Sequence, residues 1–263
     1  NNWVKASETT LYDHFSNTIE VIDINGNKAT TKRIDNASKV LATCNAPYDD
    51  FAYSGGEYNN GGMIMDIGFS NTGRSNLKAH TGIYSVNVNS GGDGFSHTLD
   101  NYNSGKYKIS VWADKINYQN ARVKINGVSS SFNGEIVPSG DWVQLNHYID
   151  LDGTTKNISV SSLSGSIYFD DYRIHPISSS LESYVYNGWN ELTHILGGNN
   201  LATFFDYDDG SRLVGVYSET PEFGNTNIGG FNLVKEYEYR YLNEAGNIPE
   251  EEDYSALSLS ITI

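Results

Sequence analysis

Hydrophobic and polar positions alternate along this chain over short stretches, and most of these stretches end at Gly, Asn or Asp. A period of two is typical of β-strands with one buried face, and those three residues favour tight turns. From Met63 to Ile174 the pattern predicts eight strands, at 63–68, 83–89, 95–100, 106–113, 121–126, 142–149, 156–161 and 166–174. No helical period is sustained there, which indicates a β-sandwich or jelly roll.

Similar strand patterns flank this region. Asn25-Gly26 lies between two short β-type runs and is a strong β-hairpin signal. Beyond Pro176, Tyr-rich stretches separated by Gly and Asn form a loose internal repeat of further hairpins. We therefore expect an all-β chain in three parts: a hairpin lead-in at 1–50, a jelly-roll sandwich at 51–176 and a hairpin region at 177–263.

The stretch "IYFDDYRIHP" places two acids inside a predicted strand. Strict alternation puts Asp171 on the same face as the apolar Ile167 and turns Asp170 to the opposite face. A carboxylate on an apolar face is costly unless it is compensated. A metal ion, backbone amides at the end of the strand or the nearby Arg173 could each compensate it.

Composition limits the classes of partner that this chain could bind. The net charge of −15 and the pI of about 4.6 argue against nucleic acid, which needs clustered basic residues. Neutral glycans, cations or basic protein surfaces are better partners for a chain with this negative charge. No apolar run reaches 18 residues, so we expect no membrane span. The single cysteine, Cys44, is expected to be a buried thiol. The chain starts at Asn1 without a leader, so we expect a fragment of a longer secreted or surface protein.

The segments "FFDYDDGSRLVGV" and "LVKEYEYRY" resemble YD-repeat proteins, also called RHS-like, whose units carry Tyr-Asp, then Gly, then Arg-Leu. In a hairpin, Asp-Gly turns the chain and Arg pairs with a carboxylate or stacks on an aromatic ring. The matching positions are Tyr207, Asp208, Gly210, Arg212 and Leu213. The segment "YNGWNEL" lacks the Tyr-Asp, so a long shell of repeats is not implied.

The segments "LKAHTGIYSV", "DWVQL" and "IYFDDYRIHP" resemble the galactose-binding-like jelly rolls of carbohydrate-binding modules. The opening, from "LYDHFSNTIEVIDINGNKA" to "ATCNAPYDDFAYSGGE", is similar to the segment before such a jelly roll in large secreted YD-repeat proteins of gliding bacteria. That resemblance implies a secreted or cell-surface protein, adhesin-like or toxin-like, exported through the type IX secretion translocon. No sorting signal for that route can be read in the sequence.

The jelly-roll resemblance also implies a structural Ca²⁺ ion at one edge of the sandwich. It maps acidic ligands onto Glu57 and Asp171, and backbone carbonyls onto the turn from Lys78 to Thr81, with Gly55 as a further candidate. Ca²⁺ takes six to eight oxygen ligands, which such a set can supply. Instead of the aromatic residue that the family usually has before the acid, this chain has "GGE".

A glycan site is the second candidate. Trp112 lies on the more polar face of its strand, where an exposed indole could stack on a sugar ring. Tyr118, Gln144 and Asn146 could supply polar partners. The alternative is that the lead-in or the C-terminal region covers Trp112, which would make it an interdomain contact.

Catalytic motifs are missing: the sequence has no G-x-S-x-G, no H-E-x-x-H and no phosphate-binding Gly-rich loop. We therefore expect a non-catalytic module that binds a glycan or cell-surface polysaccharide, or that acts as a scaffold. The alternative is a recognition region for type IX secretion or surface attachment. A glycan-active enzyme is the third reading.

Overall fold

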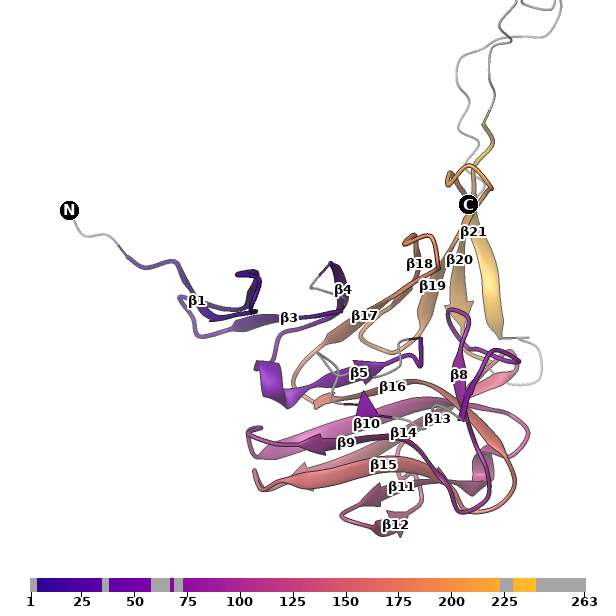
Figure 1. Cartoon of the computed structure of the whole chain (residues 1–263), viewed down its shortest axis with the longest axis horizontal. Coiled ribbons are helices and arrows are strands. Elements are labelled where there is room, and N and C mark those ends of the chain that lie inside the picture. Colours follow the sequence, from indigo (N-terminus) through magenta and orange to yellow (C-terminus); the bar gives the residue numbers. More distant parts are fainter. Residues whose placement is uncertain (1–3, 35–37, 58–66, 69–72, 223–228, 240–263) are drawn as a thin grey trace, which may run out of the picture.

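A computed structural model describes residues 4–34, 38–57, 67–68, 73–222 and 229–239. It confirms the all-β prediction, because antiparallel strands in three sheets dominate these ranges (Figure 1). Short 3₁₀ turns occur at η1 (Tyr48–Asp50) and η3 (Tyr118–Asn120). Within the same ranges, no helix is long and apolar enough to cross a membrane.

Two of the sheets form the predicted sandwich. One contains, in spatial order, β13 (Ile136–Ser139), β14 (Trp142–Leu151), β10 (Gly105–Asp114), β16 (Ile167–Pro176), β8 (Ser85–Val88) and β7 (Arg74–Ser75), with β5 (Ala52–Ser54) also paired to β16. The other contains β12 (Val128–Ser130), β11 (Ala121–Ile125), β15 (Lys156–Ser162), β9 (Asp93–Leu99) and β6 (Ile67–Gly68). Each of the eight predicted strands has a counterpart here, although part of the first, 63–66, lies outside the described residues.

The inner faces of these two sheets enclose one apolar core. Ile109 and Phe169 from the larger sheet and Phe95, Val123 and Val160 from the smaller one are fully buried in it. Burying an apolar side chain of this size contributes about 1.5–3 kcal/mol relative to leaving it in water. The alternation read from the sequence therefore corresponds to a real division between core and outer faces.

The third sheet joins both flanks of the sandwich. It contains β1 (Ser7–Tyr12), β2 (Thr18–Asp23), β3 (Lys28–Ile34), β4 (Lys39–Cys44), β17 (Leu181–Tyr186), β18 (Leu192–Leu196), β19 (Ala202–Tyr207), β20 (Leu213–Thr220) and β21 (Gly230–Glu236). The junction is the antiparallel pairing of β4 with β17, in which Cys44 lies opposite Leu181. The hairpins before and after the sandwich are thus parts of one continuous sheet (Figure 1).

The middle of this nine-stranded sheet packs against the outer face of the larger sandwich sheet, where Trp112 and Arg173 donate to the backbone carbonyls of Asn200 and Leu181. A second apolar cluster fills the space between them, with Leu181, Val185 and Leu196 from the nine-stranded sheet against Phe51 and Tyr53. Cys44 belongs to the same cluster and is a free, buried thiol, as expected. Part of the outer face of the larger sheet is therefore a packing surface for this cluster.

Five hairpins of the nine-stranded sheet share one type of turn, over residues 13–17, 23–27, 187–191, 197–201 and 208–212. In each, the first N–H donates to the fifth carbonyl and the fourth N–H donates to the first carbonyl. The fourth residue has positive φ in every case: Ser16, Gly26, Asn190, Asn200 and Ser211. This geometry is a type I turn followed by a left-handed residue. The hairpins predicted at Asn25-Gly26 and at 208–212 are confirmed.

Candidate functional site

The acidic pair in β16 lies at a β-bulge. Pairing with β10 is regular on both sides but shifts between Ser110 and Trp112, and Asp171 has a φ of 47°. Asp tolerates the left-handed region better than most residues do. The bulge breaks the alternation, so that Phe169 before it and Tyr172 after it both face the sandwich core.

The predicted separation of the two acids is therefore wrong. Asp170 and Asp171 are both buried, and both bind the loop that contains His80 and Thr81. Asp170 accepts hydrogen bonds from the backbone N–H groups of His80, at 2.7 Å, and Thr81, at 3.3 Å. Asp171 accepts one from the Thr81 hydroxyl, at 2.9 Å, and another from the Tyr53 hydroxyl, at 2.8 Å. One strand thus clamps one loop through two adjacent carboxylates.

His80 links this clamp to the nine-stranded sheet. Its Nδ1 lies 2.7 Å from Asp171 Oδ2, its Nε2 lies 2.9 Å from Glu219 Oε1 on β20, and its ring stacks on Trp112 at 3.9 Å. Burial opposes protonation, but Glu219 and Asp171 outweigh it and raise the pKa of His80 to about 9. Burial also acts to raise the pKa of Asp171, but the hydrogen bond and charge of His80 lower it overall. A buried imidazolium therefore joins two carboxylates at neutral pH.

Residues predicted to hold Ca²⁺ gather near this clamp. Glu57 Oε1 accepts hydrogen bonds from the backbone N–H groups of Ile83 and Tyr84, each at 2.7 Å. Burial raises the pKa of Glu57 to about 7. The hydrogen bonds from those two amides act to lower this pKa, and the charge of Asp171 acts to raise it. A Cβ at Gly55 would lie 2.7 Å from the Tyr53 hydroxyl oxygen, so the close approach there requires glycine.

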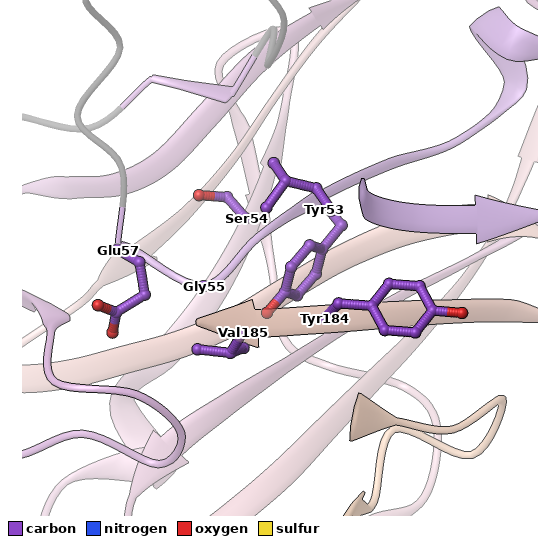
Figure 2. A pocket seen from close by; sticks show the side chains of 7 residues that line it. Tyr53, Ser54, Gly55, Glu57, Tyr184 and Val185 are labelled. Atoms are coloured by element: carbon purple, nitrogen blue, oxygen red, sulfur yellow. The ribbon is translucent and has the colours of Figure 1, made fainter. Parts of the chain in front are cut away.

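Figure 2 shows Glu57 and Tyr53 reaching from β5 and the turn after it toward Val185 on β17. They line a cavity of about 10 Å³ together with Ser54 and Gly55. That volume is close to the minimum that holds one water molecule. The predicted ligands thus lie at the seam between the sandwich and the nine-stranded sheet.

As arranged, these residues do not form a calcium cage. The Asp171 oxygens accept hydrogen bonds from Tyr53, Thr81 and His80, so these donors occupy the lone pairs that a Ca²⁺ ion would need. The Lys78 carbonyl accepts from the Ser85 hydroxyl, and the Lys78 ammonium pairs with Asp114 at 3.2 Å. No group of three or more His, Cys, Asp or Glu side chains in the described part could hold a metal. Calcium stays a prediction, and it would require Asp171 to exchange its partners.

Trp112 does not form a surface platform for a sugar. It is fully buried, and its indole N–H donates to the backbone carbonyl of Asn200 at 3.0 Å. Gln144, opposite Trp112 on β14, donates to the carbonyl of Asn199, and Asn146 donates to the carbonyl of Glu135. The turn between β18 and β19 therefore covers this face, which is the interdomain contact considered as the alternative.

Tyr118, the remaining candidate for the glycan site, lies in η3 and packs partly buried against the sandwich core. The four predicted glycan-binding residues are therefore not one site. Local alternation placed Trp112, Gln144 and Asn146 on the same outer face correctly. It could not reveal that a later hairpin covers this face.

A different groove opens on the nine-stranded sheet, where the turns of two hairpins meet. Its volume is about 550 Å³, and its lining includes Trp189, which is 85% exposed, together with Phe205 and Tyr207 of β19. Four acids also line it: Glu191, Asp206, Asp208 and Asp209. The signal in the sequence was "YNGWNEL", where a Trp stands in a turn and has no strand face on which to be buried.

The two turns beside the groove are held by side chains that cap their own backbones. The Asn187 side-chain carbonyl accepts from the N–H groups of Trp189, at 2.9 Å, and Glu191, at 3.0 Å. Asp208 Oδ1 accepts from the backbone N–H groups of Gly210 and Arg212, and Asp208 Oδ2 pairs with the Arg212 guanidinium at 2.6 Å. Both contacts expected for Arg212 are present: its guanidinium pairs with Asp208 and lies 5.2 Å from the centre of the Tyr239 ring. These caps fix the backbone that carries Trp189 and Asp209.

Comparison with known proteins gives little similarity. No protein-family model matches the chain, and no curated protein matches it. Among solved structures, the chain is similar to the CBM22-1 and GH10 modules of a Clostridium thermocellum endo-1,4-β-D-xylanase complexed with xylohexaose. The match has 16% identity and a TM-score of 0.28, and it covers 50% of this chain and 27% of that chain. The resemblance to secreted YD-repeat proteins stays a prediction, and the all-β sandwich is the level at which this chain is assigned.

Proposed function

We propose that this chain is a non-catalytic, glycan-binding module of a larger secreted or cell-surface protein. The observation that carries the proposal is the almost fully exposed indole of Trp189 beside a groove with further aromatic and acidic side chains. Sugar rings present flat apolar faces that stack on aromatic rings, and their hydroxyl groups donate to carboxylates. The groove volume of about 550 Å³ falls within the range of small-ligand sites.

Two groove acids favour binding over glycoside hydrolysis. A glycosidase needs a carboxylic acid whose pKa is raised so that it can protonate the leaving group. Here hydrogen bonds from Ser211 and Asn187 lower the pKa of Glu191. The side chain and backbone of Arg212 lower the pKa of Asp208. Both acids are therefore ionised acceptors at neutral pH and are unsuited to the role of general acid.

The test is a binding screen of plant, bacterial and fungal polysaccharides with the whole chain, with Trp189→Ala as the variant. We expect Trp189→Ala to weaken binding at least tenfold, because it removes the stacking surface, which corresponds to about 1.4 kcal/mol. Val128→Ala is the matched control: it removes another exposed apolar side chain, 72% exposed on β12 of the sandwich. Absence of any glycan ligand, or equal binding by Trp189→Ala, would contradict the proposal.

A further inference from the structure

The groove beside Trp189 is acidic. Its carboxylates are Glu191, Asp206, Asp208 and Asp209, and the described residues that line it include no Lys, Arg or His. Unlike charges attract more strongly inside a concave site than on a flat surface, because the field is focused there. The lining itself therefore distinguishes between ligands by their charge.

Only part of this negative charge is neutralised. Asp208 is compensated by Arg212, whose guanidinium lies 2.6 Å from it. Glu191 accepts a hydrogen bond from the neutral Asn187 amide, which leaves its charge in place. The carboxylates of Asp206 and Asp209 have no hydrogen-bond or ion-pair partner among the described residues. Three uncompensated acids thus line one groove.

The aromatic side chains add a second attraction for cations. Trp189, Phe205 and Tyr207 line the same groove as the four acids. The face of an aromatic ring attracts an ammonium group, and Trp does so most strongly. Aromatic rings together with carboxylates therefore match a ligand that offers both a flat ring and a positive charge.

The charge of the whole chain acts in the same direction. At −15, it repels polysaccharides that carry carboxylates or sulfates, and a groove with only acids adds local repulsion. Neutral sugars meet no such barrier, but they leave the free carboxylates without a charged partner. The expected order of affinity is aminated, then neutral, then acidic glycans.

We propose that this groove binds glycans whose sugars carry free, protonated amino groups, such as β-1,4-linked glucosamine oligomers. This inference rests on the proposed glycan-binding function and names the chemical class of its ligand. The ring stacks on Trp189, and the ammonium groups approach Asp206 and Asp209.

The experiment compares hexamers of one linkage that differ at the second carbon of each ring. Glucosamine, N-acetylglucosamine and glucose hexamers are titrated into the whole chain by calorimetry at pH 6, with hexalysine as a probe that has charge but no sugar ring. We expect the glucosamine hexamer to bind at least tenfold more tightly than the other two hexamers. Raising the salt from about 0.05 M to about 0.5 M should reduce this preference, because salt screens exposed charges.

Two variants separate charge from stacking. The double variant Asp206→Asn, Asp209→Asn should lose the preference for the glucosamine hexamer, because Asn still accepts hydrogen bonds but carries no charge. Trp189→Ala should weaken binding of all hexamers. The control Asp150→Asn changes an exposed acid on β14 of the sandwich and should alter neither. Unchanged melting temperatures exclude misfolding as a cause.

The outcomes distinguish the two proposals. Equal affinity for charged and neutral hexamers overturns the amine preference and leaves the glycan-binding function standing. Hexalysine binding as tight as that of the glucosamine hexamer overturns the inference, because charge alone would then account for it. If no hexamer binds while other polysaccharides do so through Trp189, the ligand class is wrong; if no glycan binds at all, both proposals fail.

Discussion

His80 is a buried cation held between carboxylates of two different sheets. Its ring nitrogens lie 2.7 Å from Asp171 on β16 and 2.9 Å from Glu219 on β20. Breaking a buried, hydrogen-bonded ion pair by removing one partner costs about 3–5 kcal/mol, because the other charge stays buried. This one side chain therefore contributes to the attachment of the nine-stranded sheet to the sandwich.

The raised pKa of His80 predicts how stability depends on pH. The pKa of His80 is about 9 in the folded state, above the unfolded value of 6.5. The stabilisation from this group is therefore fully present below pH 6.5 and is lost as the pH rises through 9. Between pH 7 and 9 we expect the free energy of unfolding to fall by about 2 kcal/mol from this group. The pKa of Glu57 is about 7, so Glu57 changes the free energy of unfolding mainly below pH 7.

Urea unfolding at pH 7, 8 and 9 measures this effect. In His80→Gln the slope should disappear, and stability at pH 7 should drop by about 3 kcal/mol. His14→Gln, which changes an exposed histidine of the lead-in, should keep the slope. A wild-type stability that is flat from pH 7 to 9 would show that His80 is not the cation in this clamp.

A chelator tests whether Ca²⁺ replaces the histidine. With Asp171 occupied by His80, Thr81 and Tyr53, we expect the same melting temperature in EDTA and in millimolar Ca²⁺ at pH 7. An ion that binds only the folded state would raise the melting temperature, because at a free Ca²⁺ concentration c it stabilises that state by RT ln(1 + c/Kd). A rise in Ca²⁺ would therefore mean that the metal displaces these donors and that the resemblance is right.

The gathering of Glu57, Gly55 and Asp171 at one place could be predicted from their motifs. The role of His80 could not, because it depends on Glu219, which is distant in sequence and belongs to a different sheet. The bulge at Asp171 also escaped prediction. A single residue with positive φ reverses the facing of all later positions in the strand, and no turn-forming Gly marks it.

At the level of elements, the repeated turn is the feature that unites both halves of the nine-stranded sheet. Five hairpins end in the same hydrogen-bonded loop with a left-handed fourth residue. Only one of these five positions is Gly, while two are Ser and two are Asn. Asn tolerates this conformation, and Ser does so less well.

Replacing serine at this position should therefore stabilise the protein. Ser16 has a φ of 67°, and the left-handed conformation costs an L-residue about 1–2 kcal/mol. After the greater unfolded-state entropy of glycine is subtracted, we expect Ser16→Gly to gain about 0.5–1 kcal/mol. The control Ser129→Gly, in the exposed strand β12, should lose stability. Denaturant midpoints measure both; a loss in Ser16→Gly would contradict the turn assignment.

The sequence revealed individual hairpins but only part of their common design. Asp208 and Arg212 matched a known motif, and Asn25-Gly26 is a standard turn signal. Four of the five turns begin with Asp or Asn, whose side-chain oxygen accepts hydrogen bonds from the backbone N–H groups of the third and fifth residues: Asp13, Asp23, Asn187 and Asp208. The inner positions differ from turn to turn, and the fifth turn begins with Gly197. All five share one backbone conformation, and the capping residue at the first position is the part of it that the sequence shows.

At the scale of the molecule, the pairing of β4 with β17 decides the architecture. The partners Cys44 and Leu181 are far apart in the chain, and nothing in the local pattern of either strand specifies the other. The expected division at 1–50, 51–176 and 177–263 followed changes in sequence pattern and composition along the chain. In space, the described strands of the first and last of these segments lie in the same sheet.

That seam also determines how the chain would respond to tension. Residues 45–180 form a loop whose two ends are tied together by the ladder between β4 and β17. A pull applied at β1 and β21 is transmitted through this ladder and does not enter the sandwich while the ladder is intact. The sandwich is thus mechanically in parallel with the seam, and it begins to extend only after the seam has ruptured.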